Sequence, residues 1–227
     1  MEFNIIYRDQ WLCAVDKPCG MMVHRSSRST DDQFIMGLLR DQLGQRVWPI
    51  HRLDRATSGV LLFALDAETA SQLGHQMMAR TVCKKYLAVV RGYTEVTGQI
   101  NHSLKLEGRG PEQAAHTDYC RVGQMELPIA IGRYPTARYS LIEAWPRTGR
   151  MHQLRRHFKH LFHPIIGDTT YGEGRHNRLF RQHLNCHRML LHASDLKIQH
   201  PVEETPLRIH APLTGEFKLL VERQFVG

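Results

Sequence analysis

The chain has 227 residues, 42% of them hydrophobic, and its 30 Lys and Arg outnumber its 22 Asp and Glu, giving a formal charge of +8. This size suits one large or two small domains, and no stretch approaches the roughly 18 apolar residues of a membrane span. The N-terminus lacks the basic and apolar segments of a signal peptide, so we expect a cytoplasmic protein that does not associate with membranes.

The first quarter of the chain predicts two strands and one helix. The strands are expected over residues 3–7 and 11–15, joined by a polar turn. A polar, serine-rich loop is predicted over 24–32. An amphipathic helix over 32–43, ending at Gly44, follows it.

The middle of the chain reads as a strand over 60–65, an amphipathic helix over 67–80 and a strand over 84–91. Residues 105–114 are rich in glycine and charge and predict a loop. Further strands are expected at three places, namely 97–104, 115–122 and 137–145.

Near the C-terminus, apolar residues at helical spacing predict a helix over 148–161, stopped by Pro164. Two more strands are expected over 189–198 and 206–210. Residues 173–188 are too charged and irregular to assign. Strands outnumber helices and short turns join many of them, which indicates an α+β fold with a mixed, mostly antiparallel β-sheet flanked by helices and loops. No repeat or Pro/Ser-rich linker divides the chain, so we expect a single domain.

Five cysteines are spread along the chain, at Cys13, Cys19, Cys83, Cys120 and Cys186. Their odd number and the absence of a C-x-x-C pair argue against a disulfide framework and against a zinc knuckle. We expect reduced, mostly packed thiols.

Basic residues concentrate in the last third of the chain. Residues 146–189 contain nine Lys or Arg, seven His and two acids, Asp168 and Glu173. Such a density favours a polyanionic partner bound through its phosphates, with a solvated basic face as the alternative.

One carboxylate stands out in the run HRLDRATSG at residues 51–59. Asp54 lies among three basic residues in a turn that leads into the apolar strand 60–65. A carboxylate ringed by cations at the mouth of a buried strand is a candidate reactive group. The alternative is an aspartate that caps the turn and pairs with Arg52 or Arg55.

Several familiar site motifs are absent, including a Gly-rich phosphate loop, G-x-S-x-G and H-E-x-x-H, so we expect no cofactor. Four histidines crowd the predicted helix and its end, at His152, His157, His160 and His163. No carboxylate accompanies them before Asp168, so phosphate contacts or helix capping are favoured over a metal site.

Five blocks of the chain resemble, in order, the signatures of the RluA-like pseudouridine synthases. They are VDKPCG at 15–20, HRLDRATSG at 51–59, KKYLAVVRG at 84–92, TGRMHQLR at 148–155 with HPIIGD at 163–168, and LLHA at 190–193. The resemblance implies a pseudouridine synthase fold and an isomerase that converts uridine in RNA to pseudouridine. We expect a single catalytic domain over residues 1–227, without an S4-like N-terminal domain.

Within this family, GRYPTARY at 132–139 and HQLRRH at 152–157 are similar to the C-type subgroup that modifies tRNA. That similarity implies the uridine at position 65 in the T-stem as the target. It also implies tRNA as the partner, with no obligate protein partner and a monomeric enzyme. Cys19 and Ala56 stand where serine and proline are common.

The resemblance also assigns roles to individual residues. Asp54 is the nucleophile, which attacks the ribose C1′ or the uracil ring or acts through a glycal. Arg155 pairs with Asp54 and keeps it ionised, although it could instead be a phosphate contact. Tyr86 stacks on the uracil and offers its hydroxyl for proton transfer, although a packing role is the alternative.

The remaining roles concern RNA binding. The resemblance implies that Arg52 fills the space left by the flipped base, and that Lys17 either contacts phosphate or closes the first hairpin. Leu53 and Gly59 are expected to be structural. The other predicted RNA contacts are Arg150, His152, Arg156 and Lys159.

Three other functions remain open. The same enzyme class could act on ribosomal RNA or on another tRNA site. A non-catalytic RNA-binding module could use the same fold, in which case Asp54 would be dispensable. A His-rich metal protein would bind zinc stoichiometrically.

Overall fold

The structure is a computed structural model that describes residues 2–24, 33–106 and 109–225. It divides into two compact units, and each is described here by itself. The first unit comprises Met1–Lys84 and Ala193–Pro212, and the second comprises Lys85–His192 and Leu213–Gly227. The chain passes between them three times, within the strands β5 (Cys83–Arg91) and β11 (Leu191–Gln199) and again between Pro212 and Leu213.

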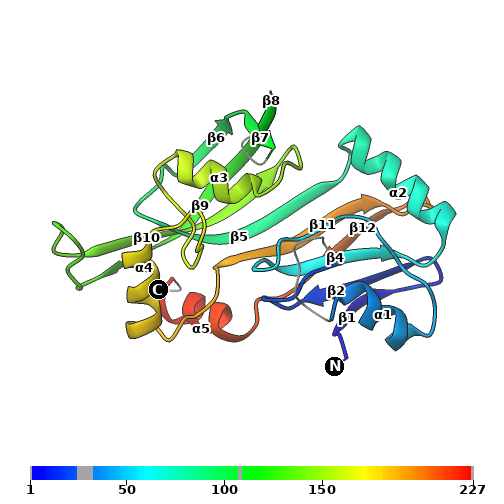
Figure 1. The fold of residues 1–227 in the computed structure, drawn as a ribbon, viewed down its shortest axis with the longest axis horizontal. Helices are drawn as coiled ribbons and strands as arrows, with labels where there is room; N and C mark the ends of the chain where they lie inside the picture. The colour runs from blue at the N-terminus through cyan, green and yellow to red at the C-terminus, as the bar shows by residue number, and fades with distance from the viewer. Residues whose placement is uncertain (1, 25–32, 107–108, 226–227) are drawn as a thin grey trace. The chain divides into compact units, whose positions relative to one another are not determined.

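The first unit is a β-sheet with two helices (Figure 1). Its strands run in the order β1-β2-β4-β11-β12, and the short β3 also pairs with β4. Besides β11, its elements are β1 (Ile5–Arg8), β2 (Leu12–Lys17), α1 (Ile35–Leu43), β3 (Trp48–Pro49), β4 (Ser58–Ala64), α2 (Ala67–Ala79) and β12 (Pro206–His210). Every predicted strand and helix of this region is confirmed within a few residues. From residue 25 on, the predicted loop 24–32 lies outside the described residues.

The apolar run of β4 is explained by cores on both of its faces. Successive side chains of a strand point to opposite faces. Leu61 and Phe63 therefore join a buried cluster with Leu39 of α1. Leu62, between them, joins a second cluster with Leu73 of α2. Burial on both faces favours a continuous apolar strand over an alternating one.

The second unit holds an antiparallel sheet in the order β5-β10-β9-β6, a separate hairpin of β7 and β8, and three helices (Figure 1). The strands besides β5 are β6 (Thr97–Asn101), β7 (Leu104–Leu106), β8 (Arg109–Gln113), β9 (His116–Leu127) and β10 (Ala137–Pro146). The helices are α3 (Gln153–His160), α4 (Gly174–His183) and α5 (Gly215–Gln224). Together with the first unit, this arrangement confirms the predicted α+β class.

Two of these helices are not anticipated from the sequence. The chain over 173–188 contains α4, whose buried side chains include Leu179, Phe180 and the polar His176. With so few apolar residues the periodic pattern is faint, and tertiary packing supplies the stability. The second unpredicted helix, α5, buries Phe217 and Leu220 in the same cluster as α4.

Several boundaries also differ from the prediction. The strand expected over 97–104 ends at Asn101, and the strand expected over 115–122 continues to Leu127. The chain expected to be a loop over 105–114 forms most of the β7–β8 hairpin, with residues 107–108 outside the description. The helix expected from residue 148 starts at Gln153. It starts late because His152, with φ of 53°, adopts a left-handed backbone conformation that a helix cannot contain.

None of the helices in the described ranges combines the length and apolar character needed to cross a bilayer. The single catalytic domain over 1–227 and the cytoplasmic location stay predictions.

Candidate active site

The run 51–59 forms a tight turn that leads directly into β4. The backbone N–H of Thr57 donates to the carbonyl of Asp54 over 3.0 Å, and β4 begins at the next residue, Ser58. Asp54 itself is half-buried. Arg52 is exposed, and its Nη1 lies 3.5 Å from Nε2 of His24. This turn, residues 51–59, is called the elbow below.

A buried lysine holds the backbone of the elbow. Lys17 is 0% exposed, and its Nζ donates to the carbonyls of Pro18, Arg55 and Thr57 at 2.9, 3.1 and 2.8 Å. A buried ammonium needs such acceptors because desolvation without them is costly. These bonds differ from both roles expected of Lys17, a phosphate contact or closure of the first hairpin, because the side chain braces the turn that carries Asp54.

The segment after Lys17 adds further bonds to the elbow. The N–H of Gly20 donates to the carbonyl of Arg55 at 2.8 Å, and Nε of Arg55 donates to the carbonyl of Gly20 at 2.9 Å. The Sγ of Cys19 lies 3.1 Å from the carbonyl of Ala56. The two residues that depart from the common family pattern, Cys19 and Ala56, are therefore in contact.

Gly59 permits the exit from the elbow, as predicted. Its φ is +111°, which L-residues rarely adopt. A Cβ at this position would lie 2.2 Å from the carbonyl oxygen of Ala193 in β11. Backbone cannot move aside as a flexible side chain can, so this position requires glycine.

His51, the first residue of the elbow, is held in its neutral form. Burial, followed by the nearby charge of Lys84, lowers the pKa of His51 to about 3. Its Nε2 accepts a hydrogen bond from the N–H of Leu62 at 3.2 Å. The ring therefore serves as a structural acceptor rather than as a cation.

Tyr86 and Arg155 belong to the second unit. Tyr86 is half-buried on β5, paired with Ala144 of β10. Arg155 on α3 is 7% exposed and makes a two-pronged pair with Asp168, in which Nε donates to Oδ2 at 2.7 Å and Nη2 donates to Oδ1 at 2.9 Å. Sequence reasoning missed this partner, although Asp168 is one of the two acids in the basic region.

Asp168 is built to stay ionised. Burial alone would raise its pKa, but the bonds from Arg155 and from the N–H groups of Thr170 and Tyr171 hold the pKa below its usual range. Such a fixed carboxylate orients the guanidinium through two parallel bonds. Arg155 is therefore a pre-positioned cation rather than a mobile surface residue.

Tyr171 is a second residue that sequence reasoning missed. Its ring lies 5.1 Å from Cζ of Arg155 and 5.8 Å from Nζ of Lys159, within the range of cation–π attraction. Its hydroxyl lies 3.1 Å from Nδ1 of His152. Three of the predicted site residues thus gather around one aromatic ring.

The other two predicted RNA contacts of this region lie against backbone carbonyls. Nη1 of Arg156 donates to the carbonyl of Lys105 at 2.8 Å, and Nε of Arg150 donates to that of Ala114 at 3.1 Å. Each guanidinium has five N–H donors, so these bonds still leave donors for phosphate.

A family model described as RNA pseudouridylate synthase matches residues 12–160. That match covers more than half of the chain. The chain belongs to this family. It is accordingly an enzyme of the isomerase class, as the resemblance of the five sequence blocks predicted.

Curated relatives of this pseudouridylate synthase agree with the assignment. A protein of Vibrio parahaemolyticus described as tRNA pseudouridine synthase C is 45% identical, with 98% of this chain and 95% of the relative covered. Proteins of the same description from Pasteurella multocida and Vibrio cholerae are each 48% identical, and they cover 97% and 92% of this chain and 96% and 91% of their own lengths.

Two solved structures share the fold of the synthase. Human RNA Pseudouridylate Synthase Domain Containing 1 matches with a TM-score of 0.74 at 27% identity, over 93% of this chain and 84% of its own. Human RNA Pseudouridylate Synthase Domain Containing 4 matches with a TM-score of 0.75 over 97% and 92%. At its 23% identity, the second likeness shows the fold alone.

The family match includes Asp54, Tyr86 and Arg155 but ends before Asp168 and Tyr171. Asp54 belongs to the first unit of the synthase and Arg155 to the second. The predicted pair between them, like the other assigned roles, stays a prediction.

Two of the clustered histidines have structural partners. His157 lies 2.9 Å from Oγ1 of Thr117 and donates to the carbonyl of His102 at 3.0 Å, and burial lowers its pKa to about 4. His163 donates through Nδ1 to the carbonyl of Arg91 at 2.7 Å. Within the described ranges of the synthase, no three His, Cys, Asp or Glu side chains are grouped as metal ligands.

Proposed function

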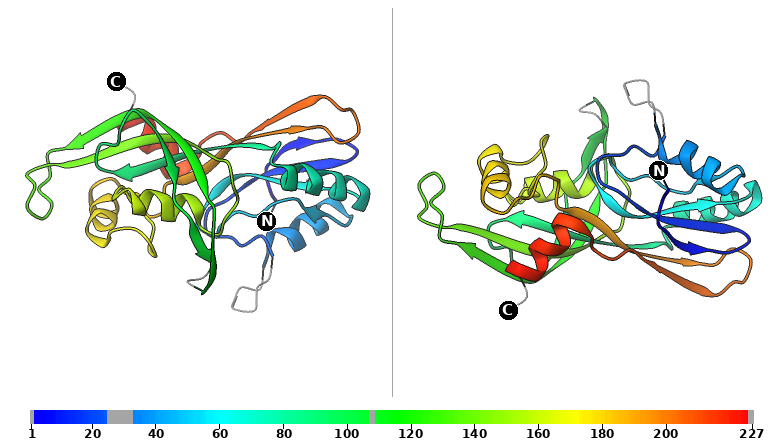
Figure 2. Two further views of the ribbon diagram at one scale, coloured as in Figure 1. Left: turned by 90° about the horizontal axis from the view of Figure 1, so that it is seen from above. Right: turned by 90° about the horizontal axis from the view of Figure 1, so that it is seen from below.

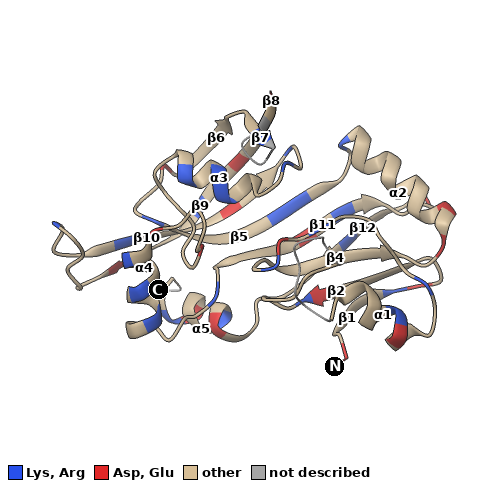
Figure 3. Ribbon diagram, in the orientation of Figure 1, with Lys and Arg blue, Asp and Glu red and all other residues tan. Residues whose placement is uncertain are grey.

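We propose that this synthase converts a uridine of tRNA to pseudouridine. The observation that carries the proposal is the identity of 45–48% to proteins described as tRNA pseudouridine synthase C, over more than nine-tenths of both chains. The dense basic character of residues 146–189 agrees with a polyanionic substrate. Figure 3 shows Lys and Arg on α3 and α4.

The reaction is an isomerisation and therefore needs no external electron donor or acceptor. The bond between ribose C1′ and uracil N1 breaks, and a bond from C1′ to uracil C5 forms. N1 gains a proton and C5 loses one, so atoms and electrons balance. The protein has to provide a nucleophile, hold the detached base and move the proton from C5.

Asp54 is the proposed nucleophile. A carboxylate can attack as an anion and later depart as one. The elbow suits this role because Lys17, Cys19 and Gly20 tie its backbone to a neighbouring segment. A braced backbone keeps a reactive group in one position through the cycle. Attack on ribose C1′, attack on the ring and the glycal route are all compatible with this placement.

Arg155 is proposed to pair with Asp54 and to stabilise its ionised form. Nε and Nη2 of the guanidinium donate to the two oxygens of Asp168. These two bonds fix the orientation of the guanidinium plane and therefore the position of Nη1. Tyr86 is proposed to stack on the uracil and to take part in proton transfer at C5. Its half-buried position on β5 exposes part of the side chain.

Arg52 is proposed to occupy the space from which the target base is flipped. Unstacking a base costs a few kcal/mol, and an inserted side chain offsets part of that cost. The exposed position of Arg52, two residues before Asp54, agrees with this role. The proposed phosphate and sugar contacts are Arg150, His152, Arg156 and Lys159. The proposed target is the uridine at position 65 in the T-stem.

Mapping pseudouridine in the RNA of cells with and without this protein tests the proposal. One missing site in the T-stem of tRNA is the expected result. If the missing site lies in ribosomal RNA or elsewhere in tRNA, the proposed substrate is wrong, and the protein is still a pseudouridine synthase. No missing site would remove the proposed function.

The nucleophile is tested with Asp54→Asn, which should abolish pseudouridine formation in purified tRNA and leave tRNA affinity near that of the wild type. The matched control is Asp41→Asn, an exposed acid on α1 paired with Arg40, which should keep full activity. Full turnover by Asp54→Asn would overturn the assignment and support a non-catalytic Asp54.

A further inference from the structure

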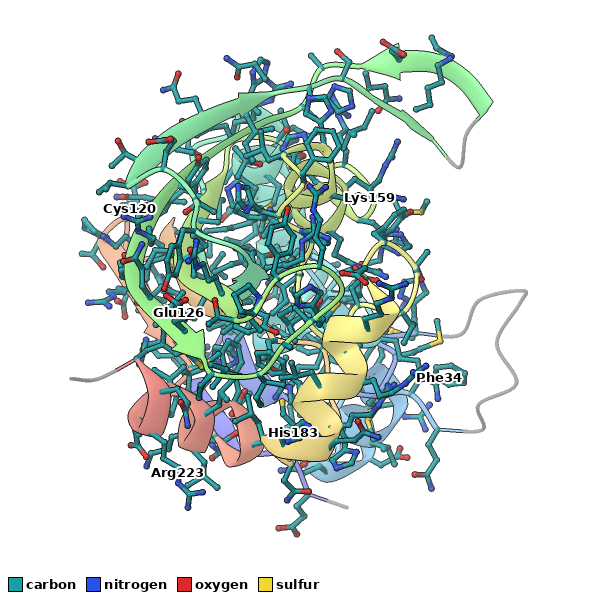
Figure 4. All side chains as sticks on the ribbon, turned by 90° about the vertical axis from the view of Figure 1, so that its left-hand side faces the viewer. Phe34, Cys120, Glu126, Lys159, His183 and Arg223 are labelled. Carbon is teal, nitrogen blue, oxygen red and sulfur yellow. The ribbon has the colours of Figure 1, made fainter. Side chains whose placement is uncertain are left out.

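A pocket of about 670 Å³ lies wholly within the second unit. It is bordered by the end of β5, the loop from β9 to β10 (residues 128–136), the end of α3 and the start of α4. Figure 2 shows this loop at one end of the unit beside α4, and Figure 4 looks onto the same side, with Glu126 on β9 and His183 on α4 labelled. The volume is that of a site for a small organic group.

The pocket is separate from the residues proposed to touch the target base. Arg91, in its wall, is five positions beyond Tyr86 on the same strand. At the rise of a β-strand, that spacing is roughly 16 Å. Whatever the pocket binds is therefore not the uracil that is proposed to stack on Tyr86.

Arginine dominates the charge of the pocket wall. Four arginines and one acid, Glu173, line it, so the formal charge is four minus one, or +3. Arg91 is neutralised by Glu173 at 3.2 Å, and Arg138 by Glu126, just outside the wall, at 3.2 Å. These two arginines hold the walls together.

The other two arginines are not ion-paired within the described residues, although Nη2 of Arg133 donates to the Tyr134 hydroxyl at 2.9 Å and its Cζ lies 5.1 Å from the centre of that ring. Arg133 and Arg175 are exposed, and neither is ion-paired to any carboxylate that the structure describes. Nη1 of Arg175 lies against the loop, 3.3 Å from where a Cβ on Gly132 would stand. A guanidinium presents parallel N–H donors that match the oxygens of a phosphate.

Two aromatic rings stand exposed beside these arginines. Tyr134 is 56% exposed and Phe162 is 79% exposed, and both line the pocket. Exposed aromatic rings next to basic side chains are the usual surface on which unpaired bases of RNA stack.

Phe162 has an energetically unfavourable backbone conformation. Its φ of +61° is rare for a bulky L-residue and is maintained by an Arg91 Nη2 bond of 2.8 Å to its carbonyl. Its N–H also donates to the carbonyl of Lys159 at 3.0 Å. The exposed ring of Phe162 does not stabilise the core. Exposed apolar side chains on strained backbone are typical of ligand-binding sites, which favours such a role for Phe162.

We infer that this pocket binds an unpaired nucleotide of the substrate RNA, with a phosphate at Arg133 and Arg175 and a base stacked on Phe162 or Tyr134. The inference rests on the proposed function for the identity of the RNA. Because the pocket is remote from Tyr86, it reads a segment of the RNA other than the target uridine.

The phosphate contacts are tested by two double variants of the full chain that remove equal charge. Arg133→Ala with Arg175→Ala changes the pocket, whereas Arg178→Ala with Arg181→Ala removes two exposed arginines of α4 outside it. Affinity for an unmodified tRNA transcript is measured at several salt concentrations. The pocket variant should bind about tenfold more weakly and reduce the log–log salt slope by about two. Equal losses in the two variants would overturn the inference.

The stacking contact is tested with Phe162→Gly, which removes the ring and relieves the strained φ. We expect unchanged or higher thermal stability together with about tenfold weaker tRNA binding and an unchanged salt slope. The control is Leu219→Ala, an exposed apolar residue of α5, which should bind as the wild type does. Wild-type affinity of Phe162→Gly would remove the base-stacking part.

Two readouts separate this inference from the proposed function. Pseudouridine formation at saturating tRNA should be normal in the pocket variants, because the pocket contributes affinity and not chemistry. A wild-type protein that binds tRNA through the pocket but forms no pseudouridine would remove only the proposed function. If the Arg133→Ala, Arg175→Ala variant loses affinity for a nucleoside monophosphate but keeps its affinity for tRNA, the pocket binds a free nucleotide instead.

Discussion

The elbow at 51–59 and the loop at 128–136 both place an arginine near a glycine with positive φ. The backbone of the elbow is held by buried contacts, whereas the arginine and tyrosine of the loop are exposed. In the elbow, backbone carbonyls are held by the buried Lys17, and Gly59 presses against the backbone of β11. The loop is closed by the two hydrogen bonds between Ile131 and Tyr134, and its arginine and tyrosine are exposed.

The difference separates two tasks that the same residue types can perform. A reactive carboxylate requires a position fixed to a fraction of an ångström, and buried backbone contacts provide it. A contact to RNA phosphate requires accessible donors that can adjust to the partner. We therefore expect substitutions in the elbow to act on folding and catalysis, and substitutions in the loop to act on affinity.

The sharpest contrast is between the two glycines. Gly59→Ala should lower the free energy of unfolding by about 4 kcal/mol, because its Cβ would overlap the Ala193 carbonyl at 2.2 Å in addition to the unfavourable φ. Gly132→Ala should cost only about 1 kcal/mol, since its Cβ meets the movable end of Arg175 at 3.3 Å. Urea denaturation of both variants measures the difference. Equal losses would erase the distinction between the two turns.

The buried lysine offers the next largest effect. Lys17→Met should cost about 3 kcal/mol, because the carbonyls it holds would lose a charged donor while remaining buried. Arg133→Met in the loop should stay within about 0.5 kcal/mol of the wild type, as expected of an exposed residue. Denaturation midpoints report the stabilities, and a wild-type midpoint for Lys17→Met would show that the elbow does not depend on this side chain.

The contrast between fixed and accessible groups recurs on α3, where His157 is fully buried and His160 is exposed. Burial lowers the pKa of His157 to about 4 from an unfolded value near 6.5. The unfolded chain therefore binds more protons between these values. The contribution of neutral His157 to the free energy of unfolding is therefore present above about pH 6.5. It is lost as the pH falls toward 4, and the loss is about 2 kcal/mol at pH 5.

Replacing His157 by Gln should remove this part of the pH dependence, measured as unfolding free energy at pH 7 and pH 5. His160→Gln serves as the control and should keep the wild-type difference. His51, His102 and His176 also have lowered pKa values but are present in both variants. Identical pH dependence in the two variants would mean that His157 is not protonated on unfolding in this range.

The smallest expected effect concerns Arg156, which is half-buried and follows the buried Arg155 on α3. Arg156→Ala should weaken tRNA binding and reduce the log–log salt slope by about one, as loss of one phosphate contact does. Arg223→Ala, an exposed arginine of α5, is the control that should leave the slope unchanged. A wild-type slope for Arg156→Ala would restrict its role to the bond with the Lys105 carbonyl.

Local patterns predicted the elements that carry strong periodicity. The apolar run of β4 and the one-sided pattern of α2 appear within two residues of the expected bounds. The helix α4 escaped prediction because two of its buried side chains are polar. His176 bonds with the Tyr139 hydroxyl, and Asn177 bonds with the backbone of Gly167 and Asp168. Polar residues read as exposed until their partners are known.

The sequence by itself determined the α+β class, the family resemblance and the residues of the elbow, because these depend on residue order over short stretches. Only the tertiary structure decided that Lys17 is buried under the elbow, that Asp168 orients Arg155, and that the loop at 128–136 forms a basic pocket with α4. These features arise from side chains 13 to about 40 positions apart, and the burial of a charge depends on partners that folding brings to it.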